Sequence, residues 1–73
     1  MEEKILEICE DVDSSIDYSR EDLIDGGHIT SVTLIAIIGE ISDAFDIDIP
    51  YEDIIPENFN SIAAMADLVE SYV

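Results

Sequence analysis

Apolar residues recur at steps of three and four in three segments of this chain, at about residues 5–16, 31–45 and 61–72. They do not alternate with polar residues over any stretch of useful length. A spacing of three and four gathers side chains on one face of an α-helix, whereas a half-buried strand needs a period of two. This pattern constrains the fold more than any other feature, and it predicts an all-α protein.

The first expected helix is followed by a long loop. The apolar residues on its inner face are Ile5, Ile8, Cys9, Val12 and Ile16. The polar run 13–15 ends this helix, and the chain from there to Thr30 predicts a loop. In this loop Leu23 and Ile24 are expected to tuck against the core, and the glycine pair at 26–27 supplies turn conformations that other residues resist. A loop of this length in a compact domain is often functional.

The second connection is expected to contain one short helical element. Residues 51–55 predict a single helical turn closed by Pro56, because proline disfavours helix at the residue before it. Asn60 or Ser61 is then the expected cap of the last helix. Residues 1–73 are therefore expected to form a single domain. It is a small bundle of three main helices plus one short helix, with a long loop between the first and second helices.

The charge of the chain is strongly one-sided. Nineteen acidic residues face two basic ones, Lys4 and Arg20, and the formal net charge is −17. We expect no binding to nucleic acid or to an anionic membrane, because both attract Lys and Arg and repel carboxylates. A protein partner with a basic patch is favoured, since such a field steers encounter. The alternative is that the acidity only confers solubility. In either case the self-repulsion costs stability, and added salt should reduce that cost.

The sequence contains no recognisable targeting or anchoring segment. No run approaches the ~18 uninterrupted apolar residues of a membrane-spanning helix. The acidic start at residues 1–4 also lacks the layout of a secretion signal. Cys9 is the one cysteine, which excludes an internal disulfide and suits a reducing compartment. Its place on the inner face of the first helix predicts a small core residue. We expect a cytoplasmic monomer.

The second helix carries two apolar faces on a helical wheel. A broad stripe predicts its core side, with Ala44 at the edge: Leu34, Ile37, Ile38, Ile41 and Phe45. Outside the stripe, next to Ser31, lies an outer flank formed by Val32, Ile35, Ala36 and Gly39. Acidic residues surround this flank, namely Glu40, Asp43, Asp46 and Asp48. An apolar centre with a charged surround is a common interface layout, so the flank is interpreted as a partner-docking surface. The alternative is that the first helix or the long loop covers it.

Ser31 lies where the glycine-containing loop meets the second helix, and two roles are open for it. Thr30 or Ser31 caps the helix, or Ser31 is an attachment point for chemistry that the protein's own side chains cannot perform. A nucleophilic pair of His28 and Ser31 is disfavoured, because so small a bundle has little room for a water-excluding pocket. The aspartates between residues 43 and 48 lack the spacing of a calcium-binding loop, so no dedicated metal site is expected.

Three segments together resemble those of an acyl carrier protein or peptidyl carrier protein: LIDGGHITS at 23–31, FDIDIP at 45–50 and PENFNSI at 56–62. The resemblance covers essentially the whole chain. It implies that Ser31 carries a 4′-phosphopantetheine arm through a phosphodiester, and that the thiol of the arm holds an acyl or aminoacyl group as a thioester. It also implies a non-catalytic carrier that is modified by a phosphopantetheinyl transferase. Such a carrier docks through its outer flank on basic patches of loading and condensing enzymes.

One position departs from the family pattern. The residue before the modified serine is usually aspartate, and here it is Thr30. Threonine lacks the charge that helps to hold the magnesium ion of the transferase, so modification is expected to be slow, to need a dedicated transferase, or to be absent. The outer flank is also less acidic than in fatty-acid carriers. This favours a specialised stand-alone carrier, although fatty-acid, polyketide, D-alanyl and peptidyl carriers share the frame. The alternative from another class is a degenerate carrier fold that acts as an acidic interaction module without the arm.

Overall fold

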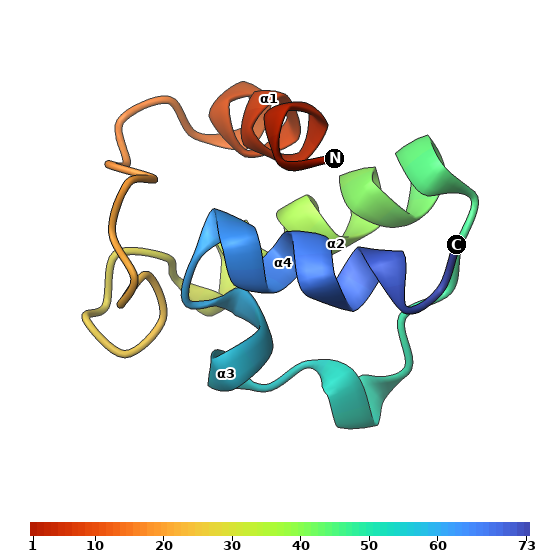
Figure 1. The fold of residues 1–73 in the computed structure, drawn as a ribbon. Coiled ribbons are helices and arrows are strands. Elements are labelled where there is room, and N and C mark those ends of the chain that lie inside the picture. The colour runs from red at the N-terminus through yellow and green to blue at the C-terminus, as the bar shows by residue number, and fades with distance from the viewer.

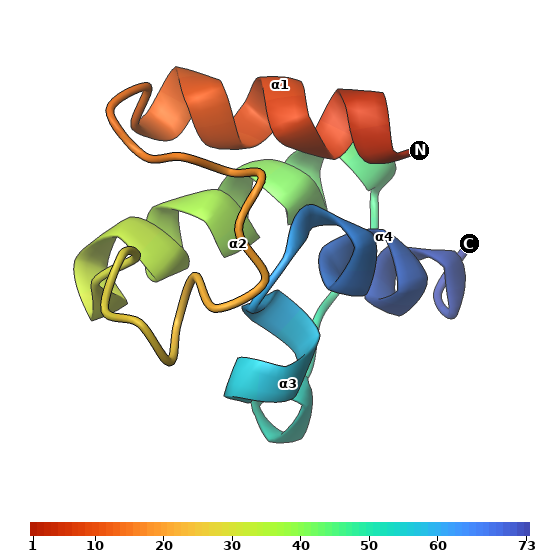
Figure 2. The same cartoon turned by 60° about the vertical axis from the view of Figure 1, so that its left-hand side comes forward.

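A computed structural model describes residues 1–73 as a set of helices without any strand (Figure 1). The all-α prediction is therefore confirmed. In chain order the elements are α1 (Glu2–Val12), α2 (Ser31–Phe45), the 3₁₀ turn η1 (Tyr51–Asp53), α3 (Pro56–Phe59) and α4 (Ile62–Glu70). Helix α1 packs against both α2 and α4, and the short α3 packs against α4 on the side away from α1 (Figures 1 and 2). The loop of residues 13–30 runs along one edge of the bundle and delivers the chain to the amino end of α2.

The core is assembled from every part of the chain. Its fully buried side chains come from all four α-helices and from the long loop: Ile5, Cys9, Leu23, Ile37, Ile41, Phe59, Met65 and Val69. No polar or charged side chain is buried among them. The predicted core role of Cys9 is confirmed, and its sulfur lies 3.9 Å from that of Met65 in α4. Leu23 is fully buried and Ile24 partly buried, as expected of the loop residues that anchor to the core.

The end of α1 is fixed by side chains of the loop that follows it. The Asp13 N–H donates to the Cys9 carbonyl, and the Asp13 carboxylate accepts hydrogen bonds from the backbone N–H and hydroxyl of Ser15. The Tyr18 hydroxyl lies 2.9 Å from the Cys9 carbonyl oxygen and 2.7 Å from that of Asp13. These contacts satisfy carbonyls that a helix end leaves without an intrahelical partner. The predicted break at 13–15 is confirmed. The prediction that Ile16 lies on the first helix is wrong, because α1 ends at Val12 and Ile16 is a half-buried loop residue.

The connection between α2 and α4 holds two short helices rather than one. The predicted turn at 51–55 is present as the shorter η1, which already ends at Asp53, so the prediction that Pro56 closes it is wrong. Pro56 is the first residue of α3, a four-residue helix that the sequence analysis did not predict. Proline suits that position, because its missing N–H has no intrahelical acceptor there and its φ is already helical. Asn58 donates from its side chain to the Asp53 carbonyl, and the fully buried Phe59 anchors α3 to the core.

Helix α4 is shorter than expected at its carboxyl end. Ser61 is its cap, with the Ser61 hydroxyl accepting a hydrogen bond from the Ala64 N–H at 3.0 Å. The helix ends at Glu70 rather than Tyr72. Tyr72, which continues the apolar spacing of the last segment, lies beyond the helix: its side chain is exposed and its hydroxyl donates to the Asp53 carboxylate. The hydroxyl favours this contact over burial, because a buried tyrosine must still find a hydrogen-bond partner.

Candidate functional site

Ser31 is the first residue of α2 and is exposed. The cap of α2 is Thr30, whose hydroxyl oxygen accepts a hydrogen bond from the Thr33 N–H at 3.3 Å and lies 3.1 Å from the Thr33 hydroxyl. Of the two capping residues left open by the sequence, the structure therefore selects Thr30. The Ser31 hydroxyl is not needed to hold the helix end and is open to solvent.

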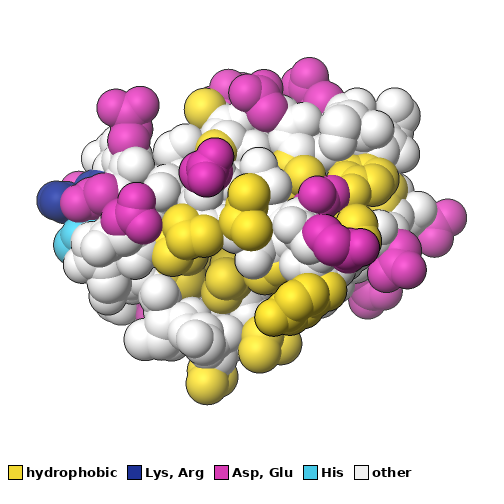
Figure 3. Space-filling model, turned by 90° about the horizontal axis from the view of Figure 1, so that it is seen from below, with side chains coloured by type: hydrophobic (Ala, Val, Ile, Leu, Met, Phe, Trp, Pro, Cys, Tyr) yellow, Lys and Arg dark blue, Asp and Glu magenta, His cyan; other side chains and the backbone are white.

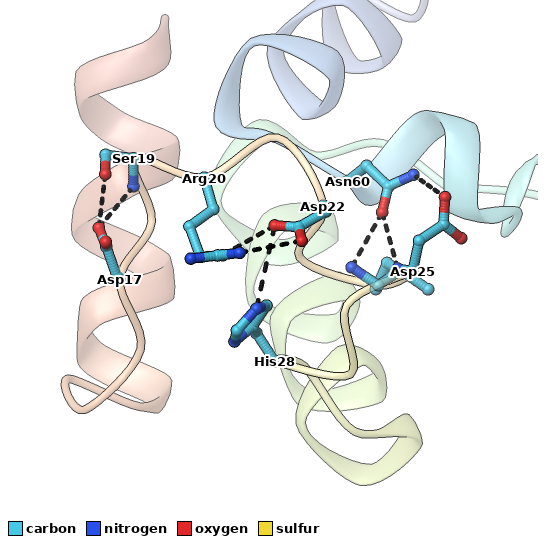
Figure 4. Close-up of polar contacts among 8 residues, drawn as sticks. Asp17, Ser19, Arg20, Asp22, Asp25, His28 and Asn60 are labelled. Atoms are coloured by element: carbon cyan, nitrogen blue, oxygen red, sulfur yellow. Dashed lines mark hydrogen bonds and ion pairs between the residues drawn. The ribbon is translucent and has the colours of Figure 1, made fainter.

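The loop before Ser31 is held in place by a turn around Asp22 (Figure 4). The Gly26 N–H donates to the Asp22 carbonyl at 2.7 Å, and the N–H groups of His28 and Ile29 both donate to the Leu23 carbonyl. A side chain at Gly26 would come within 2.6 Å of the Asp22 carboxylate and 2.7 Å of the Asp22 carbonyl oxygen, so only glycine fits. Gly27 has φ +73°, in the left-handed region that favours glycine. Both glycines therefore have a steric reason in the turn that leads to Ser31.

His28 does not pair with Ser31. Its Nε2 lies 3.9 Å from the Asp22 carboxylate, which Arg20 also engages through two hydrogen bonds of 2.8 and 3.0 Å (Figure 4). The hydrogen bond from Arg20 lowers the pKa of the Asp22 carboxyl below its ordinary value, because it favours the charged form. No contact joins His28 to the Ser31 hydroxyl, so the chain places no general base beside the hydroxyl.

Asn60 ties the loop to the other end of the chain, and the sequence analysis missed this role. Its side-chain oxygen accepts from the N–H groups of Ile24 and Asp25 at 2.9 and 3.0 Å, and its amide nitrogen donates to the Asp25 carboxylate at 3.0 Å (Figure 4). Its carbonyl oxygen also accepts from the Leu23 N–H. Asn60 was considered only as a cap of α4. The bonded residues precede Asn60 by 36 and 35 positions in the chain, so local spacing cannot predict these bonds.

The outer flank of α2 is exposed, whereas the opposite stripe faces the core. Val32 and Ile35 are 79% and 70% exposed, while Ile37 and Ile41 are completely buried. The other residues named for docking are exposed as well, namely Ala36, Gly39, Glu40 and Asp43. The alternative that α1 or the loop covers the flank is therefore wrong. Burial varies along the core-facing stripe. Leu34, Ile38 and Phe45 are half-buried, and Ala44 at its edge is exposed.

Carboxylates surround the apolar side chains over much of the surface. In the face that Figure 3 shows, apolar groups lie in clusters that acidic side chains interrupt and border. Asp46 and Asp48 are exposed near the end of α2, and Asp46 ends this helix in a left-handed conformation with φ 53°. No group of three or more acidic, histidine or cysteine side chains is placed to hold a metal ion.

These features give the amino end of α2 a defined chemical capacity. An exposed hydroxyl without a neighbouring base is a poor nucleophile by itself, so it can react only when another protein supplies the base. The backbone N–H groups of the first helical turn and the helix dipole favour a negatively charged group at this end. The site is thus compatible with a phosphate-linked group on Ser31, and nothing in the chain crowds that position.

A family model described as the phosphopantetheine attachment site matches residues 2–69 of this sequence. The chain belongs to this family. Proteins of the family carry a covalently attached 4′-phosphopantetheine group, and they interact with phosphopantetheinyl transferases and with biosynthetic enzymes. Domains of this kind are generally non-catalytic carriers. No curated protein and no solved structure matches the chain significantly.

The all-helical architecture of this phosphopantetheine carrier agrees with its family membership. Its three longer helices and the absence of strands are consistent with the small bundle of acyl carrier proteins. None of these helices combines the length and the apolar character that a membrane span requires.

Proposed function

We propose that this protein is a carrier whose Ser31 hydroxyl bears the 4′-phosphopantetheine arm, and that it serves a specialised biosynthetic pathway. The observation that carries the proposal is the exposed Ser31 at the first position of α2, directly after the residue that caps the helix. When attached, the arm supplies a flexible terminal thiol that holds an acyl or aminoacyl group. Residues 1–73 would then act as one carrier domain, as a monomer in the reducing cytoplasm that the free thiol of Cys9 suits.

The role of the chain in the modification is to present the hydroxyl and to favour the product. Thr30 and the turn around Asp22 fix the start of α2, so that Ser31 projects from a rigid element rather than from a mobile loop. The transferase supplies the base and the metal ion. The α2 amino end then stabilises the negative phosphodiester through its N–H groups and dipole.

The outer flank is the surface by which we propose that the carrier docks. Val32 and Ile35 provide exposed apolar contact area next to Ser31, and Glu40 and Asp43 provide negative charge farther along α2. This combination suits enzymes that present a basic patch around an apolar centre, because charge steers the encounter and apolar burial holds the complex. The transferase and the loading and condensing enzymes would use this surface in turn.

The test is co-expression with a broad-specificity phosphopantetheinyl transferase, followed by mass measurement of the intact protein. We expect the wild-type chain to gain one arm and Ser31→Ala to gain none. Ser14→Ala, an exposed serine in the loop after α1, is the matched control and should be modified like the wild type. A Ser31→Ala variant that still gains the arm would contradict the proposal.

Thr30 gives a sharper version of the same test. Because threonine cannot help to hold a magnesium ion, Thr30→Asp should raise the rate of modification while keeping the helix cap, since aspartate is an equally good cap. Rates are compared by sampling the reaction over time. An unchanged rate would show that the transferase does not use this position.

A second candidate is a carrier fold that has become an acidic interaction module, and the threonine at position 30 is the observation that favours it. Such a module would keep its partner binding and its biological role after Ser31→Ala. A working carrier would keep its fold but lose its role in the pathway. Complementation of a deletion strain of the native host with Ser31→Ala separates the two.

A further inference from the structure

A groove lies between α1, the loop after it and the start of α4. Its volume is about 540 Å³, and a second hollow of about 290 Å³ adjoins it, because both are bordered by Glu2, Tyr18, Ser19 and Ile62. No residue of α2 lines either hollow. The groove is therefore separate from Ser31 and from the surface proposed for carrier docking.

The floor of the groove is apolar and firmly held. It is formed by Leu6, Ile16, Tyr18 and Ile62, of which Tyr18 is 7% and Ile62 9% exposed. The Tyr18 hydroxyl is bonded to carbonyls at the end of α1, so the ring cannot swing away to close or open the groove freely. The Asp17 carboxylate accepts from the Ser19 N–H and hydroxyl at 3.1 and 2.6 Å, which fixes the adjoining loop. The groove is thus preformed, which lowers the ordering cost of binding.

The rim of the groove is acidic. Glu2, Glu3, Glu10 and Asp17 line the larger hollow, and no basic side chain accompanies them. Arg20 borders the smaller hollow, but the Asp22 carboxylate already engages its guanidinium through two hydrogen bonds. None of the four carboxylates that line the larger hollow forms a salt bridge. An apolar floor inside an uncompensated acidic rim calls for a ligand with the opposite charge and its own apolar group.

We propose that this groove is a second protein-docking site, which binds a cationic segment of a partner that inserts a large apolar side chain between Leu6, Tyr18 and Ile62. The acidic rim attracts lysine and arginine and repels nucleic acid and anionic membranes. Because the groove does not involve α2, a partner bound here leaves Ser31 and the outer flank free. The carrier can then stay bound to one protein through the groove while a second protein acts at Ser31. This raises the effective concentration of each of these two proteins near the other.

The experiment uses the full chain with Ser31→Ala, so that no arm is present and the outcome does not depend on the proposed function. The probe is a short amphipathic peptide built only from lysine and leucine, and binding is followed by calorimetry and by backbone amide NMR shifts. We expect saturable binding, with the largest shifts at residues of the groove. The shifts should centre on Leu6, Tyr18, Ser19 and Ile62.

Two double variants separate a specific groove from general attraction to an acidic protein. Glu3→Gln with Glu10→Gln neutralises the rim, whereas Glu57→Gln with Glu70→Gln removes the same number of charges from exposed positions of α3 and α4 that do not line the groove. We expect the rim variant to weaken binding about fivefold and the control by less than about twofold. All four positions are exposed, so folding should survive in both. Leu6→Ala should also weaken binding, because it removes apolar contact area from the floor of the groove. A thermal melt checks that this variant is folded.

Three results would overturn the proposal. Equal weakening by the two double variants would mean that the peptide responds only to overall charge. Shifts centred on α2 would place the docking site on the outer flank instead. Shifts spread over the whole acidic surface, without a maximum at Leu6, Tyr18 and Ile62, would mean that the peptide has no defined site.

Discussion

The two sides of α2 are both apolar, yet they differ in almost every other respect. Ile37 on the inner side is fully buried, while Ile35 two positions away is 70% exposed. The inner side packs against a core without a single buried polar side chain, whereas the outer side is exposed to solvent together with Glu40 and Asp43. Apolar character alone therefore does not identify the core. The angular position on the helix decides which residue supports the fold and which is available to a partner.

The comparison predicts that one charge placed on each side of α2 will have opposite effects. Ile37→Asp should leave no folded protein at room temperature, because an unpaired buried carboxylate costs more than about 4 kcal/mol in a domain with little stability to lose. Ile35→Asp should change the free energy of unfolding by less than about 0.5 kcal/mol, but it should weaken docking of the transferase. Circular dichroism melts and transferase binding measure the two effects.

The half-buried members of the stripe sharpen this test. Ile38→Asp and Phe45→Asp should lie between Ile37→Asp and Ile35→Asp in stability, in keeping with their partial exposure. A ranking in which Ile35→Asp is as damaging as Ile37→Asp would show that the outer flank is packed in solution.

Asn60 is the polar anchor of the loop that precedes α2, and its loss should have the next largest effect. Asn60→Ala leaves the N–H groups of Ile24 and Asp25 without their acceptor, which should cost about 1–3 kcal/mol and loosen the loop that leads to Ser31. Both the melting temperature and the rate of Ser31 modification should fall. Asn58→Ala, which releases only the Asp53 carbonyl, is the control and should destabilise the protein without slowing modification. Equal effects on the modification rate would rule out a positioning role for Asn60.

The thiol of Cys9 in α1 provides a test of whether the core disfavours a charged group. Burial is the main cause that raises the pKa of the Cys9 thiol from 9.0 to about 11, and the nearby Glu10 adds to it. Below pH 9 the thiol is neutral in both the folded and unfolded chain. As the pH rises from 9 to 11 the unfolded chain loses this proton first, so the free energy of unfolding should fall, by at most about 1.4 kcal/mol per pH unit.

The cleanest window for that measurement is pH 9 to 10. Burial also raises the pKa of Tyr18 from 10.0 to about 12, so its contribution to the pH dependence begins mainly above pH 10. Urea unfolding of Cys9→Ala should show a flatter response than the wild type between pH 9 and 10. Parallel slopes would mean that the thiol ionises as easily in the folded chain as in the unfolded one.

The effect of salt on the melting temperature should be the smallest of those predicted here, and it reports on the net charge of the chain. With a formal net charge of −17, the folded chain suffers self-repulsion that added salt screens. We expect the melting temperature to rise by a few degrees from low to physiological sodium chloride. Glu40→Gln with Asp43→Asn should show a smaller rise. A melting temperature that does not respond to salt would mean that the carboxylates are too dispersed to repel one another.

Local rules predicted α2 well, because its signals are contained within its own sequence. Its observed bounds are those expected, since Thr30 provides a cap and residue 46 begins a non-helical segment. The buried and exposed sides followed from the helical period alone. Pro56 shows the limit of such rules: it is expected to close a helical turn, but that turn ends at Asp53, and Pro56 instead begins α3, which the buried Phe59 anchors to the core.

Features built from distant segments could not be predicted in the same way. Asn60 acts on Ile24 and Asp25, and the groove needs α1, the loop at 16–19 and Ile62 to come together in space. Tyr72 continues the helical spacing of α4, but its exposed side chain donates to the Asp53 carboxylate instead of entering the core. In each case a long-range contact outweighs the local pattern.

The central claim is that the exposed hydroxyl of Ser31 is the one position that receives the arm. The most direct measurement is fragmentation mass spectrometry of the whole protein purified from its native host, which locates the modified residue along the chain. We expect the phosphopantetheine mass on Ser31 and on no other residue. An arm found on Ser14 or Ser42, or a native protein without any arm, would contradict this account.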